Sequence, residues 1–244
     1  MTKFREFEAA MSREAKTLLA ELLEAKPDVV SRRILGLLDA GEDGSQRDEV
    51  WTEPKEQLVI QLHLRFGEIA ESVEALQDIA VYVRSFPYRR SGISKVTYLR
   101  YHVENYLDEL YILQNRMKAY LVFIARQYRL DSRSDRISAL GQAVKEHFTE
   151  ALSDAVTARG THVHQRRHSD QDLVRLRLLW PLRDDEPRRE NIYELSYKQA
   201  RKSKRLWIEQ TNRMIETLLD VYFEYLLELL FDHDGRLRFP EKPA

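Results

Sequence analysis

The chain has 244 residues, of which 43% are apolar and 32% charged, and its formal net charge is −1. This length and apolar content allow a buried core and exclude a disordered polyampholyte. The absence of cysteine excludes disulfides, thiolate nucleophiles and metal or iron–sulfur centres held by cysteine.

The N-terminal segment predicts two helices followed by a linker. Apolar residues fall near helical spacing over 3–24, and Pro27 separates this stretch from a second helical stretch over 28–40. The residues at 41–49 contain the Gly and Ser that are typical of a turn or linker. We therefore expect residues 1–50 to form a helical appendage to the main domain.

The next two predicted helices are long and belong to a core. Apolar residues recur every three or four positions over 55–84, and the stretch 95–127 is apolar on two nearly opposite sides. A helix of the second kind is central in a bundle. It also carries Asn105, Glu109 and Arg116 within or beside its second apolar side, and polar groups in such positions need partners.

The remaining elements are mostly helical by the same criterion. Apolar periodicity predicts helices over 134–158 and 190–231, whereas the alternation over 173–182 favours a short strand, with a helical turn as the alternative. Long antiparallel helices with short links predict an all-α helical bundle. We expect the main domain to span 51–235, with 236–244 as a C-terminal tail.

Charge is distributed unevenly along the chain. Residues 159–205 hold 13 Lys or Arg against seven Asp or Glu, so this segment is basic within a nearly neutral chain. Such a segment can form a surface that faces phosphates, or it can form solvated helix faces. No stretch reaches the roughly 18 apolar residues of a membrane span, and the charged N-terminus is unlike a secretory signal. We therefore expect a cytoplasmic protein that does not enter a membrane.

The junction after the predicted helix 134–158 carries groups suited to acid–base chemistry. Arg159, His162 and His164 follow one another closely there, and three of the seven histidines lie within 162–168. Imidazole exchanges protons near neutral pH, and guanidinium holds phosphate through paired hydrogen bonds. This set suits cleavage of RNA by its own 2′-hydroxyl. A histidine would take the hydroxyl proton and the arginine would stabilise the charge on the phosphorane, with no metal or cofactor required.

These features resemble the HEPN superfamily, whose helical bundles carry an Arg, four to six arbitrary residues and a His. Arg159 and His164 match with four intervening residues, and the segment 101–121 looks like the family's polar core helix. The resemblance covers roughly 55–231 and implies a metal-independent endoribonuclease, such as a toxin or an antiviral defence effector. It also implies a homodimer with a composite site, and a cognate antitoxin or defence partner protein.

The resemblance gives each candidate residue a role. Arg159 would bind phosphate, His164 would be the general acid or base, and His162 would assist it. The remaining candidates fall into two groups, residues that orient the motif and residues that contact RNA. The first group is Asn105, Glu109 and Arg116, and the second is Arg166, Arg167 and His168.

Three other interpretations stay open on the sequence alone. The first is a non-catalytic helical module that binds RNA or a protein partner, and the second is a structural bundle in which the Arg–His spacing is a coincidence. The third is a zinc or nickel site at His162, His164 and His168, but residue 165 is Gln rather than the Glu of a metalloprotease motif. We expect no metal. The isolated His63, His102 and His147 are expected to be structural.

Overall fold

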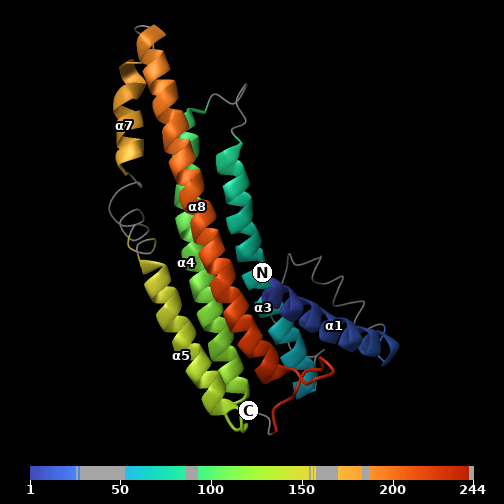
Figure 1. The fold of residues 1–244 in the computed structure, drawn as a ribbon. Coiled ribbons are helices and arrows are strands. Elements are labelled where there is room, and N and C mark those ends of the chain that lie inside the picture. Colours follow the sequence, from blue (N-terminus) through green and yellow to red (C-terminus); the bar gives the residue numbers. More distant parts are fainter. Residues whose placement is uncertain are drawn as a thin grey trace, which may run out of the picture. The chain divides into compact units, whose positions relative to one another are not determined.

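The computed structural model confirms the all-α prediction. It describes residues 1–25, 27, 53–85, 93–153, 155, 157, 170–182 and 187–241. The α-helices in this part of the chain are α1 (Thr2–Ala25), α3 (Pro54–Arg84), α4 (Lys95–Gln127), α5 (Ser134–Ala151), α7 (Gln171–Leu179) and α8 (Pro187–Leu230), and the short 3₁₀ helix η2 (Trp180–Leu182) follows α7 (Figure 1). No described helix is both long enough and apolar enough to cross a membrane.

The predicted helices agree closely with the described ones. The helix expected over 95–127 is α4 to the residue, and the one expected over 55–84 is α3 with one extra residue at its start. Helix α8 begins at Pro187, a favoured first helical residue because its missing N–H would have no helical partner there. The second N-terminal helix expected over 28–40, and the domain boundary expected near residue 50, lie outside the described residues.

The strand favoured over 173–182 is wrong, because this segment is α7 followed by η2. The carboxylate of Asp170 accepts a hydrogen bond from the backbone N–H of Leu173 and so caps the first turn of α7. Leu173 and Leu176 are buried while Val174 is exposed. A helix with apolar residues on two faces can produce the same alternating pattern as a strand.

The chain divides into two compact units that share α3, α4, α5 and α8. Unit 1 consists of 1–68, 118–144 and 218–244, and unit 2 consists of 69–117 and 145–217. Each unit therefore draws on distant parts of the sequence.

An aromatic cluster forms the centre of unit 1. The ring of Phe7 lies 4.8 Å from that of Phe223 and 5.6 Å from that of Phe231, and the ring of Phe4 lies 5.2 Å from that of Phe66. The backbone N–H of Phe4 also donates to the carboxylate of Asp220 on α8 at 3.1 Å. Because these rings are buried, they hold α1 against the end of α8 (Figure 1).

An ion pair fastens the C-terminal segment to unit 1. The guanidinium of Arg133 binds the carboxylate of Asp131, with 2.7 Å between Nε and Oδ1, and it donates further to the carbonyls of Leu229 and Phe239. The buried carboxylate of Asp131 also accepts the backbone N–H of Glu241 at 3.0 Å. One buried pair therefore satisfies backbone groups that follow α8.

Unit 2 contains α7 and α8 as far as Thr217. The carboxylate of Asp170 pairs with Lys204 on α8, and the ring of Trp180 packs on that of Tyr193 at 5.7 Å. The hydroxyl of Tyr98 on α4 lies 3.2 Å from the carbonyls of Tyr82 and Ser85 at the end of α3. These contacts join α7 to α8 and α4 to the end of α3.

Candidate functional site

The Arg–His motif lies in a part of the chain that the structure does not describe. This applies to all six candidate residues between 159 and 168, namely Arg159, His162, His164, Arg166, Arg167 and His168. Their roles stay predictions from the sequence.

The three candidates on α4 are described, and Arg116 has a clear structural contact. Its guanidinium donates a 2.7 Å hydrogen bond to the hydroxyl of Ser72 on α3, and Ser72 is completely buried. Burial raises the pKa of the Glu109 carboxyl, and the charge of Arg116 opposes that shift. Asn105 is half-buried, one turn before Glu109. The sequence correctly indicated that polar groups on α4 need partners, and Arg116 finds one on a neighbouring helix.

Two polar residues of α4 are buried more deeply than these and were missed. Glu104 is 6% exposed and Gln114 is 4% exposed, and the Gln114 amide lies 3.4 Å from the hydroxyl of Thr149. Both lie on the side of α4 that carries Leu107, which is also buried. Glu104 and Gln114 are three and seven residues from Leu107, and this helical spacing could have predicted from the sequence that both are buried.

Of the three isolated histidines, His102 is buried and His63 is half-buried, whereas His147 is exposed on α5 (Ser134–Ala151). The ring of His102 is surrounded by three tyrosine rings, with centroids 4.3 Å away for Tyr98, 5.3 Å for Tyr101 and 5.4 Å for Tyr82. Burial lowers the pKa of His102, as it does that of His63, so both imidazoles favour the neutral form. This environment fits the structural role expected for them.

A basic pocket in unit 2 is the most distinctive candidate site in the described part of the chain. It has a volume of about 300 Å³ and is lined by Arg84, Lys198, Arg201, Lys202 and Arg205. Four of these residues follow one another on α8 at spacings of three, four and seven residues, which places them on one face of the helix. Arg84 comes from the last turn of α3.

The positive charge of this pocket is largely unneutralised. Among the described residues, Arg205 alone of the five lining residues forms an ion pair, and its Nε lies 3.3 Å from Glu209. Neighbouring lysines outside the pocket do have partners, since Lys95 binds Glu194 at 2.5 Å and Lys204 binds Asp170. Acidic groups therefore pair with cations beside the pocket and leave those within it available to an anion.

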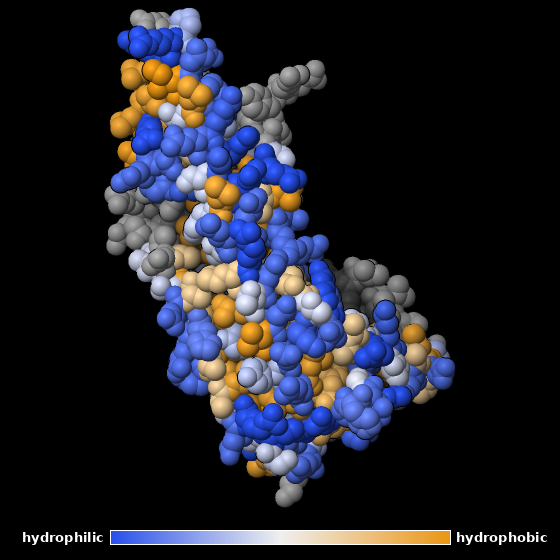
Figure 2. Space-filling model, viewed as in Figure 1, coloured by the Kyte–Doolittle hydropathy of each residue, from blue (hydrophilic) through white to orange (hydrophobic). Residues whose placement is uncertain are grey.

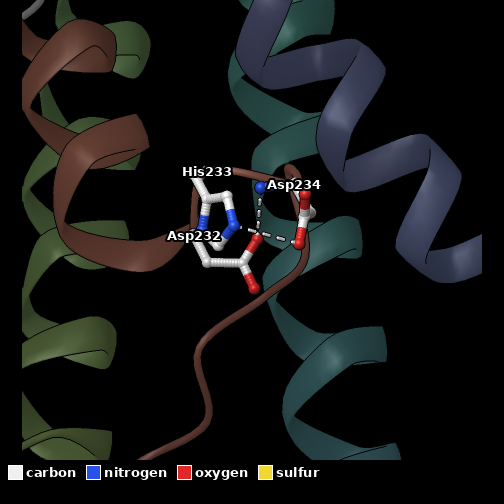
Figure 3. Close-up of side chains that lie close together, drawn as sticks. All are labelled: Asp232, His233 and Asp234. Atoms are coloured by element: carbon white, nitrogen blue, oxygen red, sulfur yellow. Dashed lines mark hydrogen bonds and ion pairs between the residues drawn. The ribbon is translucent and has the colours of Figure 1, made fainter.

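The far end of α8 holds a second group of chemically interesting side chains. Asp232, His233 and Asp234 lie close enough together to hold a metal ion (Figure 3). However, Asp232 Oδ1 accepts the backbone N–H groups of Arg236 and Asp234, each at 2.9 Å, and these bonds lower its pKa. The imidazole of His233 lies 3.3 Å from the carboxylate of Asp234 on the surface. These contacts describe a hydrogen-bonded turn, and we assign no metal to it.

Comparisons with models of protein families, with curated proteins and with solved structures find no match to this chain. The helical fold and the basic pocket are therefore the observations on which a function can be built.

Proposed function

We propose that this protein binds RNA through the basic pocket of α8. The observation that carries this proposal is the set of five cationic side chains, only one of which has an ion-pair partner in the described residues. From Lys198 to Arg205 the cations extend for roughly 10 Å along the helix, at about 1.5 Å per residue. An extended row of this kind suits successive phosphates of one strand better than a single small anion.

The proposed chemistry is that of a metal-independent endoribonuclease of the HEPN type. Arg159 would hold the phosphate, and His164, assisted by His162, would transfer the proton of the attacking 2′-hydroxyl. Arg166, Arg167 and His168 would extend the contact with RNA. The basic pocket supports the binding part of this proposal, and the Arg–His spacing in the sequence supports the cleavage part.

A homodimer stays part of the proposal. The stretch 206–231 holds Trp207, Tyr222, Phe223, Tyr225 and Phe231 in addition to its leucines, and aromatic residues beyond those that one buried side needs favour a surface for a second copy. In the structure Tyr222, Phe223 and Phe231 are buried within the chain itself, whereas Tyr225 is 51% exposed. Most of this aromatic surface therefore belongs to the core of unit 1.

The binding proposal is tested by reversing charges in the pocket. We expect the double variant Arg201→Glu with Lys202→Glu to bind a fluorescently labelled RNA at least about tenfold more weakly in an anisotropy titration, because two phosphate contacts become repulsive. The control is Arg213→Glu, an exposed position on the same helix outside the pocket, which should bind as the parent does. Equal affinity of the double variant and the parent would assign the pocket no role in RNA binding.

The non-catalytic module is the alternative to cleavage. It is selected if the parent protein binds RNA but leaves it intact over long incubation at neutral pH. If the parent protein neither binds nor cleaves RNA, both the binding proposal and the cleavage proposal are wrong.

A further inference from the structure

Helix α7 has an apolar face that the rest of the described chain leaves uncovered. Leu173 and Leu176 are buried, whereas Val174 and Leu178 are 44% and 68% exposed. In the described residues no other large apolar side chain is more exposed than Leu178. Leu182 in η2 continues the row and is 46% exposed. Exposed aliphatic side chains in a row are a common feature of interaction sites.

This face forms a shallow, open groove, and all of its described lining residues belong to α7 or to its capping residue Asp170. The groove has a volume of about 740 Å³ and is lined by Asp170, Gln171, Val174, Arg175, Leu178 and Leu179. Figure 2 shows apolar side chains gathered over α7 and the start of α8. An exposed apolar row along a helix is a surface that the apolar face of a second helix can cover.

Cations border the apolar row on both sides. At about 100° per residue, Arg175 and Arg177 lie on opposite sides of the line through Val174 and Leu178. Both arginines are exposed, and neither forms an ion pair in the described part of the chain. The neighbouring Asp170 is occupied, because it pairs with Lys204 and caps α7. The groove therefore presents aliphatic groups flanked by exposed positive charge.

We propose that this groove binds an acidic amphipathic helix of a partner protein. The aliphatic row of the partner would cover Val174, Leu178 and Leu182, and its flanking carboxylates would pair with Arg175 and Arg177. The inference does not depend on the RNA-binding proposal, because it concerns a different surface of unit 2.

Two other occupants fit the same surface less well. A second copy docked with its own α7 would bring Arg175 and Arg177 against the same arginines, in either relative direction of the two helices, and like charges in contact are unfavourable. An anionic membrane would match the charges. It would find only three aliphatic side chains in the row and no aromatic one.

The test uses two synthetic helical peptides of about 15 residues and the full-length protein. One peptide has Leu along one face and Glu along its flanks, and the other has Lys in place of each Glu. Fluorescence anisotropy should show binding of the acidic peptide alone. Leu178→Asp should weaken it at least about tenfold, as truncation of a central contact does. The double variant Arg175→Glu with Arg177→Glu should abolish the preference for the acidic peptide.

Leu64→Asp is the matched control, because Leu64 is 57% exposed on α3 outside the groove, and its variant should bind the acidic peptide like the parent. The proposal is overturned if both peptides bind equally, if neither binds, or if Leu64→Asp weakens binding as much as Leu178→Asp. Phosphatidylserine vesicles that bind in a Leu178-dependent way in place of the peptide would assign the groove to a lipid surface. A dimer in light scattering that Leu178→Asp dissolves would assign it to a second copy. If Leu178→Asp lowers the melting temperature, the arginine double variant decides the outcome.

Discussion

The hydroxyl of Tyr106 on α4 donates to the side-chain oxygen of Asn212 on α8, and the two atoms are 2.6 Å apart. The amide nitrogen of the same asparagine donates to the carbonyl of Leu76 on α3 at 3.1 Å. One amide thus joins three helices of unit 2 at a depth where Tyr106 is fully buried. Polar groups in such a position fix the alignment of helices as well as contributing to stability.

Replacing Tyr106 by Phe is expected to lower the free energy of unfolding by about 1 kcal/mol, because it leaves the Asn212 oxygen without its donor. Urea denaturation measures this change. Tyr225→Phe provides the control, since Tyr225 is half exposed on α8, and it should unfold at the parent's midpoint. A Tyr106→Phe variant as stable as the parent would mean that the hydroxyl contributes nothing at this crossing.

The pair Asp131–Arg133 predicts a specific sensitivity to acid. Hydrogen bonds from Arg133 hold the pKa of the Asp131 carboxyl well below its ordinary value of 3.8. A folded-state pKa below the unfolded one gives stability that is present above the unfolded pKa and is lost as the pH falls through the folded one. Asp131→Asn should therefore be about 2 kcal/mol less stable than the parent at pH 7.

The difference in unfolding free energy between the parent and Asp131→Asn should shrink below pH 4, because the Asp131 carboxylate of the parent then contributes progressively less stability. Urea midpoints at pH 7, 4.5 and 2.5 measure the trend. A difference that stays constant over this range would show that the charge of Asp131 is not what fastens the C-terminal segment.

Salt dependence offers a separate test of the basic pocket. Each phosphate contact with a single strand contributes about 0.7 to the slope of log affinity against log salt concentration. Lys202→Gln should reduce the slope by about this amount, and Arg213→Gln should leave it unchanged. If both variants shift affinity by a constant factor with the parent's slope, Lys202 makes no phosphate contact.

Replacing Arg159 and replacing His164 are expected to have different effects on RNA binding and cleavage. Arg159→Ala should weaken RNA binding and cleavage together, whereas His164→Ala should slow cleavage by about 10²–10⁴-fold and leave binding nearly intact. Both assays are run with EDTA present, since the proposed reaction needs no metal. Cleavage that EDTA abolishes would refute the mechanism. Loss of several degrees of melting temperature in both variants would instead indicate a structural pair.

The sequence predicted the long helices well because their apolar spacing is sustained over many turns. Helix α7 could not be predicted in this way. Val174 and Leu178 are apolar but exposed, so their presence obscured the helical spacing of the buried Leu173 and Leu176. The local signal for this helix was the capping residue Asp170, which lies just before the apolar run.

The sequence predicts only part of the basic pocket. The excess of positive charge over 159–205 includes its four α8 residues, and their spacing predicts a common face. Arg84 could not be assigned to the pocket from the sequence, because the packing of α3 on α8 brings it there. The sequence alone does not distinguish solvated cations from cations that form a binding site. In the structure, Lys95 and Lys204 beside the pocket pair with Glu194 and Asp170, and this pairing distinguishes them from most of the cations that line the pocket.

The contact of Phe4 with Asp220 also bears on how the protein is made. The two residues are 216 positions apart, so α1 leaves the ribosome long before its partners on α8 exist. At about 5–20 residues per second, this interval lasts roughly 10–40 s. During that time Phe4 and Phe7 have no aromatic partner from α8 to cover them. Until α8 has been made, the apolar face of α1 is therefore one place at which the nascent chain is exposed to aggregation.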